Sequence, residues 1–136
     1  MDTFKLKIIA SNRVFFDGEA VELVLPLSDG LKGFLAHHEH IVAPIDFGEM
    51  VITEPDGKKT DAFVGSGFVE FYDNAATVVC ISAEHPDEID KRRAEEAKQR
   101  AEEELRQKHS IVEYHQSQAN LARAMERLKI KGKHIK

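Results

Sequence analysis

The sequence has 136 residues, a hydrophobic share of 42% and a single cysteine, Cys80. This composition can form the core of one compact domain, or of a small domain with an appendage, and it excludes a wholly disordered chain. No apolar run approaches the roughly 20 residues that a membrane-spanning helix needs. The first residues lack the pattern of a signal peptide, and one cysteine cannot form an internal disulfide, so we expect a reducing, cytoplasmic location.

Charge divides the chain into two parts. Residues 1–87 carry 6 Lys or Arg and 15 Asp or Glu, whereas residues 88–136 carry 13 and 9, which gives net charges of -9 and +4. The two parts are therefore expected to face different partners. Tyr114 is the only aromatic residue of the basic part, so stacking on bases has little support and we expect no nucleic-acid partner.

Residues 3–82 alternate between apolar and polar side chains. Phe4, Leu6 and Ile8 alternate with lysines, and this period of two is typical of strands with one buried face. Turn-forming residues separate many short stretches of this kind. Pro55-Asp56-Gly57 lies between the apolar runs 50–52 and 62–64 and predicts a hairpin. The pattern predicts an antiparallel β-sandwich.

The pattern changes after His85-Pro86, because no proline and only one glycine follow. Asp87 is expected to cap a helix that runs to about Lys108, with the small residues Ala94, Ala97 and Ala101 on one narrow face. After a break at His109-Ser110, a second helix with a heptad seam is expected to end before Gly132. That seam consists of Ile111, Tyr114, Gln118, Leu121, Met125 and Leu128.

These patterns together predict an α+β fold in which an N-terminal antiparallel β-sandwich precedes a C-terminal two-helix hairpin. The expected domains are residues 1–84 for the sandwich and residues 85–136 for the hairpin. Each helix has little apolar area, so docking of the two contributes only about a few kcal/mol. We therefore expect the hairpin to be an appendage that can fold back or open onto a partner.

The sequence offers little catalytic chemistry. His37, His38 and His40 are close together, but no third ligand follows at a characteristic spacing, so we expect loop residues and no metal site. Cys80 lies in an apolar run and is expected to be a buried, unreactive thiol. Gly65-Ser66-Gly67 is expected to mark a bend or a close approach between strands. No catalytic triad or phosphate loop can be assembled, so the chain is expected not to be an enzyme.

Arginines are the more informative charged residues. Asp90, Arg93 and Arg100 share one face of the first predicted helix, and Arg123 and Arg127 share a face of the second. In a closed hairpin these four arginines could converge, where they would repel each other unless they bind an anion such as a polyphosphate. The alternative is that they form ordinary solvated helix faces.

Several segments together resemble the epsilon subunit of bacterial F-type ATP synthase over almost the whole chain. The Ile-Asp-x-x-Arg-Ala motif at 89–94 is the most specific of them. In the loop at 30–38, Leu31-Lys32 and Ala36-His37 depart from the family pattern, while His38 matches the family's histidine. The segments that carry the resemblance are Gly30 to His38, Gly65-Ser66-Gly67-Phe68-Val69-Glu70-Phe71, Ile89-Asp90-Lys91-Arg92-Arg93-Ala94, Ala97-Lys98-Gln99-Arg100-Ala101 and Leu121-Ala122-Arg123-Ala124-Met125-Glu126-Arg127-Leu128.

The resemblance implies a noncatalytic subunit of the central stalk that couples proton or sodium ion flow to ATP synthesis. It implies that the sandwich binds the gamma subunit and the ring of c subunits. It also implies that the extended helices reach the beta and alpha subunits and inhibit ATP hydrolysis. The location would be peripheral, on the cytoplasmic face of the cell membrane. A free-standing nucleotide-sensing or adaptor protein with a helical arm is the alternative function.

No cofactor is expected to be required, but the resemblance implies ATP as a regulatory ligand of the folded hairpin. The alternative is that the motif only caps and packs the hairpin. Asp90 and Glu84 would orient an arginine or accept hydrogen bonds from adenine or ribose, since acidic side chains do not favour phosphate. The residues implied in the ATP site are Glu84, Ile89, Asp90, Arg93, Ala94, Arg100, Arg123 and Arg127.

Overall fold

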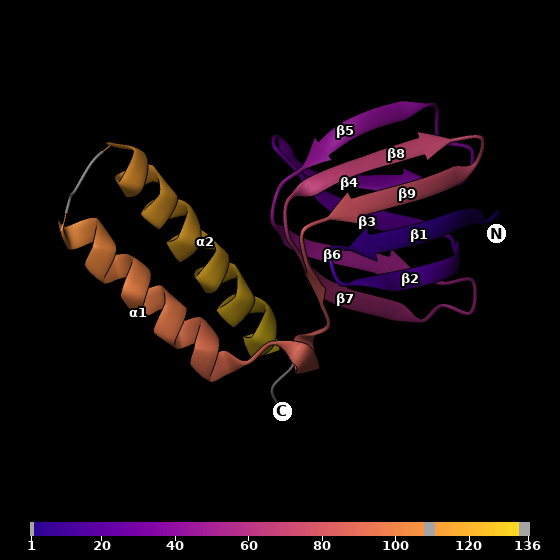
Figure 1. Cartoon of the computed structure of the whole chain (residues 1–136). Coiled ribbons are helices and arrows are strands. Elements are labelled where there is room, and N and C mark those ends of the chain that lie inside the picture. The colour runs from indigo at the N-terminus through magenta and orange to yellow at the C-terminus, as the bar shows by residue number, and fades with distance from the viewer. Residues whose placement is uncertain (1, 108–110, 134–136) are drawn as a thin grey trace. The chain divides into compact units, whose positions relative to one another are not determined.

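The computed structural model describes residues 2–107 and 111–133, which form two compact units that divide between His85 and Pro86 (Figure 1). The first unit is a β-sandwich of two five-stranded sheets with the orders β2-β1-β9-β8-β5 and β10-β7-β6-β3-β4. The strands are β1 (Phe4–Ala10), β2 (Arg13–Ala20), β3 (Glu22–Leu27), β4 (Gly30–Leu35), β5 (Ile41–Ile45), β6 (Gly48–Thr53), β7 (Lys59–Val64), β8 (Gly67–Tyr72), β9 (Ala75–Cys80) and β10 (Ala83–Glu84).

Apolar side chains from both sheets form the core of the sandwich. Phe4, Leu6 and Ile8 of β1 are buried while the residues between them face outward, which confirms the alternation predicted from the sequence. The second sheet contributes buried residues such as Leu23 and Met50. Burial of each such side chain stabilises the fold by about 1.5–3 kcal/mol. The core therefore closes within residues 1–85 alone.

Among the described strands the pairing is antiparallel with one exception. The predicted hairpin at Pro55-Asp56-Gly57 is confirmed, because β6 and β7 pair with Met50 opposite Ala62. The exception is the parallel pair of β1 and β9, in which Leu6 lies opposite Ala76. These two strands are far apart in the sequence, so no local turn sets their direction.

The expected close approach at Gly65-Ser66-Gly67 is also confirmed. A Cβ atom at Gly67 would collide with the carbonyl oxygen of Val79 and would lie 2.7 Å from the Cα of Cys80. A Cβ atom at Gly65 would lie 2.7 Å from a side-chain atom of Ile81. Side chains at these two positions would therefore push β8 away from β9 and the residues that follow it.

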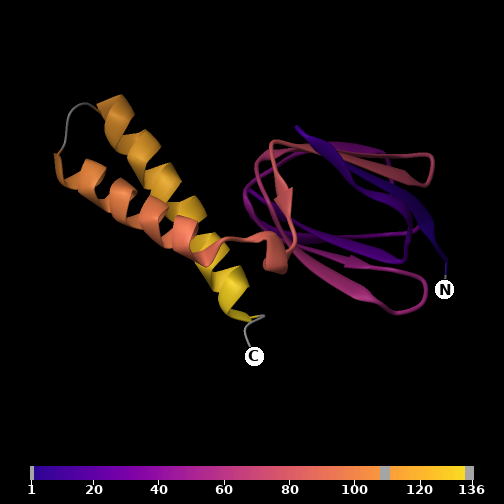
Figure 2. The same cartoon turned by 60° about the horizontal axis from the view of Figure 1, so that its bottom comes forward.

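The second unit is a helical hairpin, with the short 3-10 helix η1 (Pro86–Glu88) followed by α1 (Lys91–Gln107) and α2 (Ile111–Lys133). Figure 2 shows α1 and α2 side by side, running in opposite directions. Ala94 and Ala101 of α1 and Ala124 of α2 are buried, so small side chains allow the helices to pack closely. The predicted alanine face is thereby confirmed.

Two predictions about helix ends are wrong. Asp87 does not cap α1, because it lies within η1, and Asp90 is the capping residue. The second helix does not end before Gly132, because α2 continues to Lys133. Gly132 has no neighbouring atoms where a Cβ would be, and glycine is tolerated in the last turn of a helix at a small cost. His109 and Ser110, where a break was predicted, and the side chains of Ile111 and Tyr114 lie outside the described residues. The predicted heptad seam of the second helix is wrong at Gln118 and Met125, which are exposed, because α2 packs through the neighbouring face that carries the buried Ser117 and Ala124.

Candidate functional site

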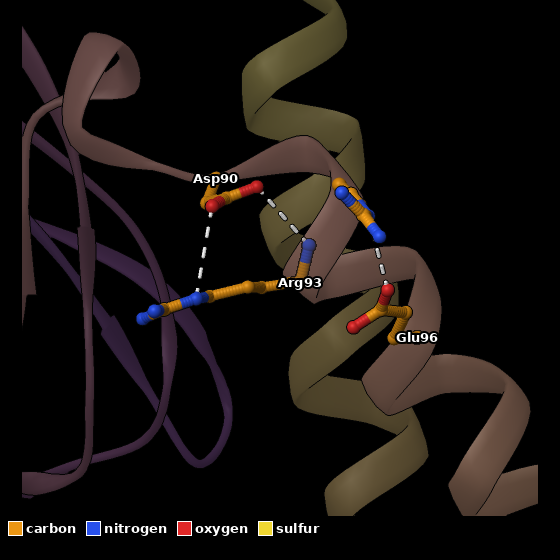
Figure 3. A network of polar contacts seen from close by, with 4 residues as sticks. Asp90, Arg93 and Glu96 are labelled. Atoms are coloured by element: carbon orange, nitrogen blue, oxygen red, sulfur yellow. Dashed lines mark hydrogen bonds and ion pairs between the residues drawn. The ribbon is translucent and has the colours of Figure 1, made fainter.

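Asp90 organises the start of α1. Its Oδ1 accepts a hydrogen bond from the backbone N–H of Arg93 at 3.1 Å, as an N-cap residue does. Its Oδ2 lies 3.7 Å from the Nε of Arg93, so the same carboxylate also holds the guanidinium (Figure 3). The Arg93 side chain is 87% exposed. The pair therefore presents an oriented cation to solvent at the beginning of the hairpin.

A hollow of about 290 Å3 lies between α1 and α2. Three alanines and five polar side chains, from both helices, line it. Its lining contains three arginines and one glutamate, so its formal charge is positive. The lining residues are Ala97, Arg100, Ala101, Glu104, Asn120, Arg123, Ala124 and Arg127.

The arginines of this hollow differ in their surroundings. Arg123 donates a hydrogen bond from Nη2 to Oδ1 of Asn120, one helical turn earlier on α2. Arg100 is exposed, and within residues 2–107 and 111–133 its guanidinium has no hydrogen bond or ion pair. Guanidinium groups bind phosphate and carboxylate through paired, charge-assisted hydrogen bonds. The hollow is therefore chemically suited to a multiply charged anion.

Glu104 is the acid among the lining residues, and a side chain of the opposite helix binds it. Ser117 of α2 donates a hydrogen bond from Oγ to Oε2 of Glu104 on α1, at 2.8 Å. Ser117 is 5% exposed, and it is the one buried polar side chain among the described residues. The bond ties the two helices together and fixes one oxygen of the Glu104 carboxylate.

The structure brings part of the sequence-predicted set together. Arg100, Arg123 and Arg127 line the hollow, whereas Arg93 does not. Ile89 and Ala94 are buried and do not line the hollow. Glu84 belongs to β10 of the sandwich unit, where it lies opposite Phe63 of β7.

Sequence reasoning missed three polar residues of the hairpin: Glu104 and Asn120, which line the hollow, and Ser117, which anchors Glu104. A signal for two of them was present. Glu104 follows Arg100 by four residues and Asn120 precedes Arg123 by three, so each shares a helix face with an arginine of the site.

The sandwich carries two exposed apolar areas, each at one edge of a sheet. On the outer face of β5 and β8, Val42, Phe68 and Tyr72 are all at least half exposed, and we call these three residues the outer apolar patch. On the edge strand β4, Leu31 and Leu35 are exposed, and we call them the β4 edge pair. Exposed apolar groups of this kind commonly mark protein interfaces.

The histidines near the β4 edge point to different partners. The His37 ring lies 3.3 Å from the carboxylate of Asp2, and the His40 ring lies 3.8 Å from that of Glu70. His38 packs against Phe34 and Phe71, with ring centroids 5.1 and 5.4 Å away, so it supports the loop. Among residues 2–107 and 111–133, no three His, Cys, Asp or Glu side chains are grouped to hold a metal ion.

Cys80 is buried at the end of β9, as predicted. Burial raises the pKa of its thiol, and a backbone hydrogen bond at Ser82 opposes this only in part. The thiol therefore stays protonated near neutral pH. No helix within the described part of the chain is long and apolar enough to cross a membrane.

Comparison with known proteins covers both units. A family model described as the beta-sandwich domain of the ATP synthase Delta/Epsilon chain matches residues 3–86, and one described as its long alpha-helix domain matches residues 87–132. The chain is 39% identical over 132 residues to an ATP synthase epsilon chain of Caldanaerobacter subterraneus subsp. tengcongensis, covering 97% of this chain and 96% of the relative. It is 42% identical over 128 residues to that of Ruminiclostridium cellulolyticum, covering 94% and 95%.

Solved structures show the same fold. A chain in the cryo-EM structure of the Euglena gracilis mitochondrial ATP synthase, comprising OSCP, F1 and the c-ring, aligns with a TM-score of 0.78 and 20% identity. The alignment covers 89% of this chain and 76% of that one. A chain in the central stalk and c-ring structure of the Tetrahymena thermophila enzyme aligns with a TM-score of 0.71 and 12% identity.

Proposed function

Because the chain belongs to the ATP synthase delta/epsilon chain family, as a noncatalytic component of the central stalk, we propose that its two units divide assembly and regulation between them. Family membership also replaces the alternative of a free-standing adaptor. The sandwich would join the stalk to the membrane motor, and the helical hairpin would control the direction in which the motor turns.

The sandwich is proposed to bind the gamma subunit and the ring of c subunits. The outer apolar patch supplies area that a protein partner can bury, and the carboxylate of Glu70 beside it can set the orientation of that partner. The β4 edge pair is proposed to face the ring of c subunits. In this proposed assembly the chain would lie at the cytoplasmic face of the cell membrane as a peripheral subunit.

The hairpin is proposed to be the regulatory arm. In an extended state its helices would reach the beta and alpha subunits and block rotation in the hydrolytic direction. The net charge of +4 over residues 88–136 supports attraction to acidic surfaces. In the folded state, close packing of the alanine seam keeps the arm away from the catalytic head.

ATP is proposed to stabilise the folded state by binding in the hollow between α1 and α2. One observation supports this most strongly: Arg100 from one helix and Arg123 and Arg127 from the other surround a single hollow. A triphosphate there would be bound by both helices at once, so binding would oppose their separation. Asp90, at the start of α1, would accept hydrogen bonds from adenine or ribose, and Ile89 and Ala94 would support that end. Arg93, held by Asp90, and Glu84 are proposed to be supporting positions.

Titration of the full chain with ATP tests this proposal. Saturable binding should be accompanied by slower hydrogen exchange across α1 and α2, and Arg127→Ala should weaken both effects without altering exchange in the sandwich. Arg93→Ala should weaken them less, because Arg93 does not line the hollow. Absence of saturation at millimolar ATP would assign the arginines to acidic protein partners instead.

A further inference from the structure

Glu104 is an unexpected lining residue, because a carboxylate in a hollow with three arginines opposes a phosphate ligand. We propose that Glu104, held in place by Ser117, makes this hollow select the magnesium complex of a nucleoside triphosphate over the free anion. The inference rests on the proposed ATP site and adds a cation preference to it. It follows from the order of the lining residues, from the fixed carboxylate and from the balance of charge.

The lining residues follow a defined order along the hairpin. Ala97 and Glu104 are seven residues apart on α1, which corresponds to about 10 Å along the helix axis. Because α2 runs in the opposite direction, Arg127 lies near the Ala97 end and Asn120 near the Glu104 end. Asp90 caps the start of α1, which lies past the end of the hollow at Ala97. A nucleoside bound near Asp90 would therefore extend its phosphate chain past the arginines toward Glu104.

The Glu104 carboxylate has one occupied and one available oxygen. Its Oε2 accepts the hydrogen bond from the buried Ser117, whereas its Oε1 has no partner in the described part of the chain. Asn120 cannot take the place of this acid, since its Oδ1 already accepts a hydrogen bond from Arg123. The available oxygen is therefore the group at this end of the hollow that can coordinate a cation.

Charge decides which form of the ligand fits. Three arginines and one glutamate give the hollow a formal charge of +2, whereas fully ionised ATP carries -4. A terminal phosphate and a carboxylate repel each other unless a cation lies between them. Magnesium is commonly bound through one or two carboxylates together with phosphate oxygens of the substrate, and it keeps several water ligands. A magnesium ion bound at Glu104 would contact both the carboxylate and the terminal phosphate, so the two groups would no longer repel each other.

The simpler possibility, that Glu104 only opposes phosphate, predicts a different change in affinity when the carboxylate is removed. A bridging role requires that its removal weaken binding of the magnesium complex. Simple opposition requires that its removal tighten binding of both forms of ATP, and of the free anion more because it carries the larger negative charge. The two therefore differ in whether binding of ATP in excess magnesium becomes weaker or tighter.

Calorimetric titration of the full chain with ATP, in excess magnesium and in excess EDTA, tests the inference. Magnesium should tighten binding to the parent protein by about tenfold. Glu104→Gln should abolish this ratio by weakening binding in excess magnesium, and Ser117→Ala should weaken that binding less, because the carboxylate remains but is no longer held. Glu103→Gln is the matched control: Glu103 precedes Glu104 on α1 but does not line the hollow, so the ratio should be unchanged.

Three results would overturn the inference while leaving the ATP site intact: equal affinity with and without magnesium in the parent protein, undiminished or tighter binding in excess magnesium by Glu104→Gln, or the same loss in Glu103→Gln. A separate result would overturn the ATP site itself. If neither the parent protein nor Glu104→Gln shows saturable binding at millimolar ATP in either condition, the hollow is not a nucleotide site.

Discussion

Replacement of Arg100 by alanine tests the proposed nucleotide site at its most accessible cation. Arg100 lines the hollow and has no competing partner in the described part of the chain. Its guanidinium is therefore available for a ligand without first breaking an ion pair. The substitution also removes one of the three arginine charges that repel each other around the hollow. The folded hairpin should therefore not be weakened in the absence of ligand.

The size of the effect follows from the contacts that are lost. Hydrogen bonds that involve a charged group contribute about 1.5–3 kcal/mol. Because Arg100 is exposed, water screens its interaction, and we expect a value at the lower end of this range. Arg100→Ala should therefore weaken ATP binding by about tenfold. Calorimetric titration measures the affinity, and hydrogen exchange in α1 and α2 reports whether the hairpin remains folded.

Arg106→Ala provides the control for lost positive charge on the same helix. Arg106 pairs with Glu102 at 3.8 Å on the surface and does not line the hollow. ATP affinity should change little, because exposed ion pairs contribute little and the charge is outside the site. Equal weakening by the two substitutions would show that only the net charge of the arm matters. Unchanged binding in Arg100→Ala would show that the hollow does not hold the phosphates.

Three further substitutions test other parts of the account. Ala101→Leu should overpack the buried face between α1 and α2, destabilise the folded hairpin by about 1–3 kcal/mol and so speed hydrogen exchange in both helices. Gln99→Leu, on the exposed side of α1, should not speed exchange. Equal exchange in the two variants would contradict the role of this buried face. Phe68→Asp should leave the sandwich folded but reduce recovery of the gamma subunit with the tagged chain, and undiminished recovery would remove the outer apolar patch from that interface. Because burial raises the folded-state pKa of Cys80 above its ordinary value of 9.0, its contribution to stability is present below that pH and lost as pH rises through the folded-state value. Cys80→Ala should therefore reduce the fall in unfolding free energy at high pH, and an unchanged slope would contradict this.

The sequence was sufficient for those parts of the fold that local patterns specify. The alternation in β1 and the turn at Pro55-Asp56-Gly57 each predicted a feature that the structure contains. The parallel pairing of β1 with β9 was not predictable in this way, because it joins residues about seventy positions apart. The end of α2 was misplaced because a single glycine costs too little to stop a helix that tertiary contacts already support.

The candidate site was predictable only in its arginines. Helical spacing indicated that Arg100 lies on a face that can meet Arg123 and Arg127, and the structure places these three around one hollow. Glu104 was missed because its contribution depends on how far α1 and α2 are shifted along each other. That offset is set by side-chain packing between the helices, which spacing along one helix does not determine.

Regulation of ATP hydrolysis by the helical arm is the central claim, and removal of the arm from the assembled complex tests it most directly. Truncation after His85 preserves the sandwich, including the stacking of His85 on Phe15 with ring centroids 4.3 Å apart. The truncated chain should still assemble with the complex, and ATP hydrolysis should rise, most strongly at low ATP concentration, where the extended state of the intact arm is favoured. Hydrolysis that is unchanged across the whole range of ATP concentrations, in a fully assembled complex, would contradict the claim.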